Sequence, residues 1–184
     1  MLPILKYFWK ICLLKSGPDR IPAEPLILGL VLTLSLIAEV VGGSLARPSQ
    51  SIVSILGTVL IEVTIIGLVT FLLLLFTNML QRFIPTYTSL LGAGIFMMVI
   101  QVPFFLIMRN TDSSTLAIFS ESVLLVCLGW WLAIVGNIYH RVANISILQG
   151  SAIGLVILIL IATAIFVVSP PPQQIQQIVG PSAL

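Results

Sequence analysis

Residues 51–82, SIVSILGTVLIEVTIIGLVTFLLLLFTNMLQR, decide the fold of this chain. The stretch stays apolar for longer than the ~20 residues that a helix needs to cross a hydrocarbon core of about 30 Å, so it predicts a transmembrane helix. Its only acidic residue, Glu62, lies near the middle. A charged and unpaired side chain at that depth costs at least ~2.5 kcal/mol. We therefore expect Glu62 to face protein or water, or to carry a proton.

The composition extends the membrane prediction to the whole chain. Of its 184 residues, 59% are hydrophobic and only 8% are charged, whereas soluble proteins have about 25% charged residues. The mean hydropathy is +1.20. A net charge of +2 does not indicate nucleic acid as a partner. Two cysteines, Cys12 and Cys127, are too few for a disulfide framework. The expected partner is the lipid bilayer.

Five apolar runs are separated by short segments that carry turn or charge signals. The runs cover residues 25–45, 52–80, 87–108, 115–139 and 145–168. We therefore expect an all-α fold, a polytopic bundle of five transmembrane helices within residues 25–168. Consecutive spans should be antiparallel because their connections are short. Ser51 and Asp112 are expected to cap helices, since a short side-chain oxygen accepts hydrogen bonds from first-turn amides.

The two ends of the chain differ from the spans. Residues 1–24 contain a short apolar segment with three lysines and adjacent aromatic residues, followed by prolines. This pattern predicts a short helix in the membrane interface and a linker, and a positively charged leader that fixes topology is the alternative. Residues 169–184 form a Pro/Gln-rich tail without charged side chains.

The basic residues predict the orientation of the spans. Six of them lie on the side of the N-terminus, and two, Arg47 and Arg109, lie on the opposite side. Lys and Arg accumulate on the cytoplasmic side of membranes. We therefore expect a protein of the bacterial inner membrane with its N-terminus in the cytoplasm and its C-terminus outside.

Polar residues inside four of the spans fall at similar depth below the expected outer surface. They are Glu39, Glu62, Gln101 and Glu121, and at 1.5 Å per residue they lie roughly 10–17 Å deep. As one hypothesis, this layer binds a proton or cation in a small transporter or ion pathway. As the other, protonated carboxyls and Gln101 hydrogen-bond across helices and fix their packing. The chain has no substrate motif and no paired, interrupted repeats, which favours the packing role.

Small residues predict close contact at the last span. Gly150 and Gly154 form a Gly-x-x-x-Gly pattern, which is typical of helices whose backbones approach closely. The pattern leaves open whether the contact lies within the chain or between copies.

Catalytic motifs are absent from the sequence. It contains no His-Glu-x-x-His zinc motif, phosphate loop or nucleotide-binding glycine run. The single histidine, His140, precedes Arg141 at the end of a span, where a cation complements the helix C-terminus. We expect no enzymatic activity, no cofactor and no metal site.

Residues 128–141, LGWWLAIVGNIYHR, lead into the small-residue last span. Together with the five closely spaced spans and the short N-terminal segment, this stretch resembles bacterial members of the Yip1 family. The Asp-Leu-Tyr-Gly-Pro motif of eukaryotic members is not present. The resemblance implies a non-enzymatic structural or interaction component that acts through lipids and through a membrane-protein partner or a second copy of itself. A transporter or ion pathway is the alternative.

Overall fold

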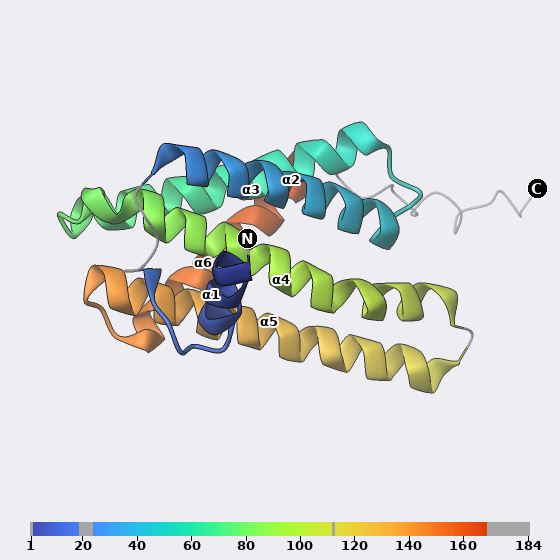
Figure 1. Ribbon diagram of the computed structural model, residues 1–184. Coiled ribbons are helices and arrows are strands. Elements are labelled where there is room, and N and C mark those ends of the chain that lie inside the picture. The colour runs from blue at the N-terminus through green and yellow to red at the C-terminus, as the bar shows by residue number, and fades with distance from the viewer. Residues whose placement is uncertain (1, 19–23, 112, 169–184) are drawn as a thin grey trace, which may run out of the picture.

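The structure, a computed structural model, describes residues 2–18, 24–111 and 113–168, and within these ranges it is all α (Figure 1). Five helices are long and apolar enough to cross a membrane, which confirms the predicted fold class. The chain is an integral membrane protein. The helices are α1 (Leu2–Cys12), α2 (Pro25–Ala46), α3 (Ile52–Phe76), α4 (Phe83–Asn110), α5 (Ser114–Ala143) and α6 (Ile147–Val168), with a 3-10 turn, η2 (Leu80–Arg82), before α4.

The helix ends follow local chemistry. Ser51 caps α3 as predicted, because its side chain accepts a hydrogen bond from the Ser54 amide at 3.2 Å. The N-cap of α5 is Ser113, and the expected cap, Asp112, lies outside the described residues. Asn144 ends α5 with a φ of 59°, a left-handed conformation that asparagine tolerates better than most residues. The Pro/Gln-rich tail also lies outside the described residues.

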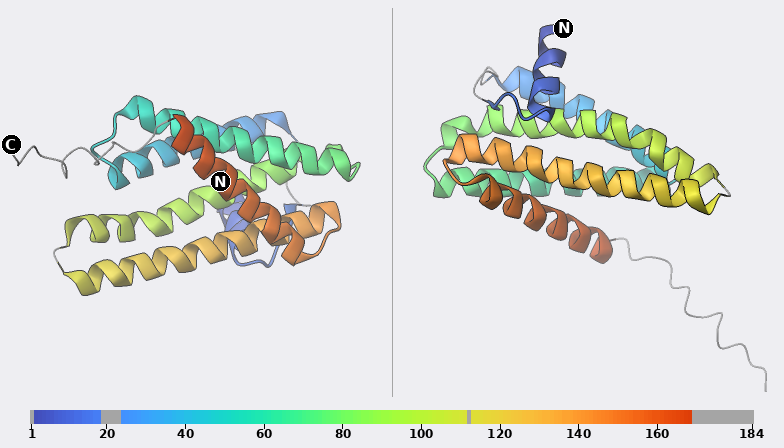
Figure 2. Two further views of the ribbon diagram at one scale, coloured as in Figure 1. Left: turned by 180° about the vertical axis from the view of Figure 1, so that it is seen from behind. Right: turned by 90° about the horizontal axis from the view of Figure 1, so that it is seen from below.

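The five spans form a closed ring. Each span packs on two neighbours in the order α3, α2, α4, α5, α6 and back to α3, and α3 also contacts α4 (Figures 1 and 2). Helices α2, α4 and α6 run in one direction, and α3 and α5 run in the other. We call the end of the bundle where α5 meets α6 the His140 end, and the end where α2 meets α3 the Arg47 end. Which end faces the cytoplasm stays a prediction.

Interhelical hydrogen bonds hold the half of the bundle at the His140 end. The hydroxyls of Thr70 on α3 and Tyr139 on α5 bond each other at 2.9 Å. Tyr87 on α4 donates to the Val63 carbonyl of α3 at 2.8 Å. Buried residues 86–93 on α4 and 134–139 on α5, the latter including the fully buried Tyr139, surround these bonds. This half is therefore closed and tightly packed.

The short N-terminal helix, α1, packs on the outside of that half. Phe8 lies against Gly92 of α4, where a Cβ would collide with its ring. Trp9 and Phe96 have ring centroids 6.1 Å apart. Trp130 of α5 donates its indole N–H to the Cys12 carbonyl at 2.8 Å. Because Gly92 lies nine residues into α4, this contact is about 14 Å along that helix from its start. The amphipathic helix α1 is thus packed against α4 and α5.

Candidate functional site

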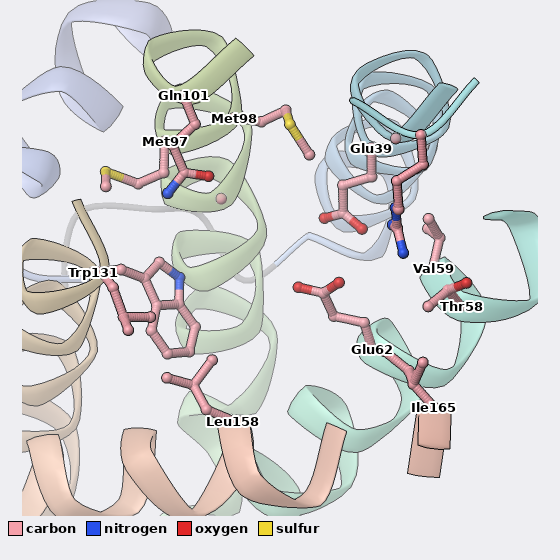
Figure 3. A pocket seen from close by; sticks show the side chains of 14 residues that line it. Glu39, Thr58, Val59, Glu62, Met97, Met98, Gln101, Trp131, Leu158 and Ile165 are labelled. Atoms are coloured by element: carbon pink, nitrogen blue, oxygen red, sulfur yellow. The ribbon is translucent and has the colours of Figure 1, made fainter. Parts of the chain in front are cut away.

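A cavity of about 260 Å³ lies between the spans and extends from the middle of the bundle to Arg47. Every one of the five spans contributes to its wall, so the cavity is a product of the whole ring (Figure 3). The polar side chains on its lining are Glu39, Arg47, Thr58, Glu62 and Gln101. Its other lining residues are glycines and apolar side chains: Gly43, Val59, Gly94, Met97, Met98, Leu128, Trp131, Leu158 and Ile165.

Two carboxyl groups face each other in this cavity. Glu39 extends from α2 and Glu62 from α3, and their carboxyls point toward one another (Figure 3). Oxygen Oε2 of Glu39 is buried and has no hydrogen-bond partner. Gly94 of α4 lies near this group, and a Cβ on it would be in ordinary van der Waals contact with Oε1 of Glu39 at 4.0 Å. An unpartnered carboxylate oxygen is costly away from water, so it marks a place where a proton or cation would be stabilised.

Arg47 supplies the one positive charge on the described lining of the cavity. It follows the last turn of α2, and Glu39, Gly43 and Arg47 are spaced by four residues, so they follow one another along a helix face. Gly43 lets the Ile55 side chain of α3 approach this face of α2 closely, since a Cβ on it would lie 2.9 Å from Ile55. The same Cβ would lie 3.7 Å from Nη2 of Arg47. The sequence prediction had placed Arg47 only among the loop charges, although the spacing of four from Glu39 was available as a signal.

The wall opposite the carboxyls is apolar. Trp131 of α5 and Leu158 of α6 lie across the cavity from Glu39 and Glu62 (Figure 3). Met98 of α4 extends toward α2 and lies against Gly42, where a Cβ would overlap its thioether. Trp131 thereby belongs to the cavity lining. The cavity therefore has a charged side and an aromatic and aliphatic side.

The structure brings together three of the four residues of the expected polar layer. Glu39, Glu62 and Gln101 line the cavity. Glu121 is exposed on the outside of α5 and is not part of the lining. The position of a residue in a span fixes its height along the helix but not the direction in which its side chain points. Glu121 is thus separated from the layer by the rotation of α5.

The polar groups of the cavity differ from those that join helices. Side chains that bond across helices in the described part of the chain include Thr70, Tyr87, Tyr139 and Ser151, the last donating to the Leu132 carbonyl at 3.1 Å. Arg109 donates from the end of α4 to the Leu45 carbonyl at 3.4 Å. Neither Glu39, Glu62 nor Gln101 makes such a bond among the described residues. The hydrogen bonds that a packing role requires are made by other residues.

The Gly-x-x-x-Gly pattern of the last span lies at the contact between α5 and α6. A Cβ on Gly150 would lie 2.7 Å from the Gly136 carbonyl oxygen, and one on Gly154 would lie 3.1 Å from Val135. The backbones of α5 and α6 therefore touch at Gly136 and Gly150. The close approach occurs within the chain.

The charges on the lining limit the chemistry of the cavity. When both carboxyls are ionised, their two negative charges and the one positive charge of Arg47 give the lining a net charge of minus one. One monovalent cation or one proton neutralises this charge. No group of three or more metal-ligating His, Cys, Asp or Glu residues occurs among the described residues. The arrangement can bind a proton or a monovalent cation in competition.

Comparisons with known proteins give no relative from which a function can be transferred. No protein-family model, no curated protein and no solved structure matches the chain. The resemblance to the Yip1 family gains no support from these comparisons.

Proposed function

We propose that the chain is a small non-enzymatic membrane transporter or ion pathway in which the central cavity binds a monovalent cation in exchange for a proton. The observation that supports this proposal is the cavity itself, which residues of all five spans line and which has Glu39 and Glu62 on its wall, one oxygen of Glu39 being buried without a hydrogen-bond partner. A ring of helices that only needed to pack would gain by filling this space, since cavities lower stability.

The exchange follows from the charge of the lining. A proton on Glu39 or Glu62 neutralises the cavity, and a bound cation does the same, so that each displaces the other. Arg47 keeps the site from holding two cations at once, because it already compensates one carboxylate. Tyr87 of the adjoining α4 does not line the cavity, and its hydroxyl donates a hydrogen bond to the Val63 carbonyl.

Proton flux in proteoliposomes tests this proposal. The full chain is reconstituted with a pH-sensitive dye inside the vesicles, and a cation gradient is applied. We expect a proton flux that Glu62→Gln reduces at least about tenfold, because the substitution removes one of two exchangeable carboxyls. Glu121→Gln is the matched control, since it makes the same change on the outside of α5. Equal flux in wild type, Glu62→Gln and empty vesicles would overturn the proposal.

The second candidate is a Yip1-like structural or interaction component of a bacterial inner membrane. Its support is the sequence of residues 128–141, which includes Gly136 and its contact with Gly150. That contact already covers the small-residue face of α6 with α5 of the same chain. The face is therefore not available for binding a protein partner. A specific partner recovered by gentle detergent extraction, together with absent flux, would favour this candidate.

A further inference from the structure

The lining of the cavity is divided in a way that a bare metal ion does not require. Its carboxyls lie on one side and Trp131 with Leu158 on the other (Figure 3). Its volume of about 260 Å³ is several times the share of about 30 Å³ that one water molecule occupies in the liquid. A single inorganic ion would occupy a small part of this space.

We propose that the cavity takes a monovalent organic cation with an apolar body, such as an alkylammonium or arylammonium compound. The cationic head lies between Glu39 and Glu62, where one positive charge neutralises the lining. The body lies against Trp131 and Leu158, which removes its apolar surface from water. This inference names the substrate class of the cavity and rests on the proposed function.

The apolar side of the lining fits such a body better than it fits a hydrated inorganic ion. Leu158 and Trp131 offer no hydrogen-bond acceptor to the water shell of sodium or potassium, apart from the ring face of Trp131. An aromatic face attracts a cation or stacks on a second ring. Met97 and Met98 add flexible side chains that adapt to different body shapes. The site therefore selects for charge and apolar surface together.

Arg47 restricts the net charge of the ligands that the cavity can bind. A compound with a carboxylate beside its ammonium group has no net charge and would leave the lining with one excess negative charge, and a dication would leave it with one excess positive charge. Both are outside the proposed class. Glu39, Arg47 and Glu62 are the titratable groups that face the ligand, because α4, α5 and α6 contribute only uncharged residues to the lining.

Binding to the purified full chain in lipid nanodiscs tests this inference, with benzyltrimethylammonium as the probe. Tetramethylammonium has the same head without the ring, and sodium is the inorganic comparison. We expect benzyltrimethylammonium to bind at least about tenfold more tightly than tetramethylammonium, because it buries a phenyl ring. Sodium should bind more weakly than either. Equal affinity for the three cations in the wild-type chain would overturn the inference, and this measurement requires no variant.

Two variants locate the bound probe. Leu158→Asn places a polar group of similar size on the apolar wall, so it should weaken benzyltrimethylammonium about tenfold and leave tetramethylammonium almost unchanged. Leu160→Asn is the matched control, since this leucine lies two residues further along α6 and is 44% exposed. An equal effect of the two substitutions, or binding that Glu62→Gln leaves intact, would show partition into the lipid and overturn the inference.

The flux assay separates this inference from the function on which it rests. Proton flux that depends on Glu62 but is unaffected by benzyltrimethylammonium would overturn the organic substrate class and leave the ion pathway. Absence of both flux and binding would overturn the two together. Competition of benzyltrimethylammonium with the Glu62-dependent flux is the result expected from both.

Discussion

Tyr139 and Glu62 are both polar residues of the helix bundle, but they lie at different levels, Tyr139 near the His140 end and Glu62 near the middle of α3. The hydroxyl of Tyr139 is fully buried and bonded to Thr70 at 2.9 Å. Glu62 lines a cavity and faces a second carboxyl, Glu39, which has an unpartnered oxygen. Polar groups in lipid stabilise a fold only when their partners are in place. The bonded groups toward the His140 end meet that condition internally, whereas the cavity would meet it with a bound proton or cation.

The N-terminal helix gives the largest expected effect, because it closes the outside of the His140 half. Burial raises the pKa of the Cys12 thiol from 9.0 to about 11. With Cys127 replaced by alanine, Cys12 is the sole thiol. We expect its labelling by a maleimide at about pH 8 to be roughly a hundredfold slower than that of the unfolded chain, because only the thiolate reacts.

The sign of the pH dependence follows from the direction of this shift. The folded state holds the Cys12 proton more tightly than the unfolded state. The contribution of this thiol to the stability of the folded state is therefore fully present below pH 9.0 and is lost as the pH rises toward about 11. Labelling should accelerate over the same range. Rapid labelling of the folded protein near neutral pH would mean that α1 is not docked on α4 and α5.

The contact between α5 and α6 gives the next largest effect. Gly136→Ala places a Cβ 2.8 Å from the Ile147 carbonyl oxygen, and a backbone atom cannot move aside as a flexible side chain can. We expect a loss of about 1–3 kcal/mol in the free energy of unfolding, as overpacking commonly costs. Reversible unfolding in mixed detergent micelles measures this. Gly129→Ala is the control on the same helix, since a Cβ there meets nothing within 4 Å.

Equal stability of the Gly136→Ala and Gly129→Ala proteins would show that α6 is not seated on α5 as described. The His140 half would then be no more closely packed than the part of the bundle that holds the cavity.

The sequence predicts the five spans well because continuous apolar runs of this length have few alternatives. It places the junction between α3 and α4 less well. The expected third span began at residue 87, after Pro85, whereas α4 begins at Phe83. A proline in the first turn removes an amide that would have no partner inside the helix, so Pro85 does not prevent the helix from starting earlier. Similarly, α3 ends at Phe76, because Asn78 takes a left-handed conformation within a stretch that is still apolar.

The site was only partly predictable, for a related reason. Helices that are apolar all round carry no stripe that reveals which face is buried. Depth along each span could therefore bring Glu39, Glu62 and Gln101 to one level, but it could not show that Glu121 points outward. The places of Arg47 and Trp131 on the lining depend on how α2 and α5 are rotated in the ring. Only the packed structure provides that rotation.

The smallest expected effect is that of Glu62→Gln on stability, and it tests most directly whether Glu62 and Tyr139 have different roles. Glu62→Gln should change the free energy of unfolding by less than about 0.5 kcal/mol, because the carboxyl makes no bond to another helix. Tyr139→Phe is the comparison, since it removes the hydroxyl that bonds Thr70 and should cost between the average of about 0.6 kcal/mol and the maximum of about 1.7 kcal/mol for hydrogen bonds between membrane helices. The same unfolding measurement serves both variants. If Glu62→Gln costs as much as Tyr139→Phe, Glu62 is a packing residue and the cavity has no separate role. A small gain in stability would instead agree with the removal of an ionised group from a poorly solvated site.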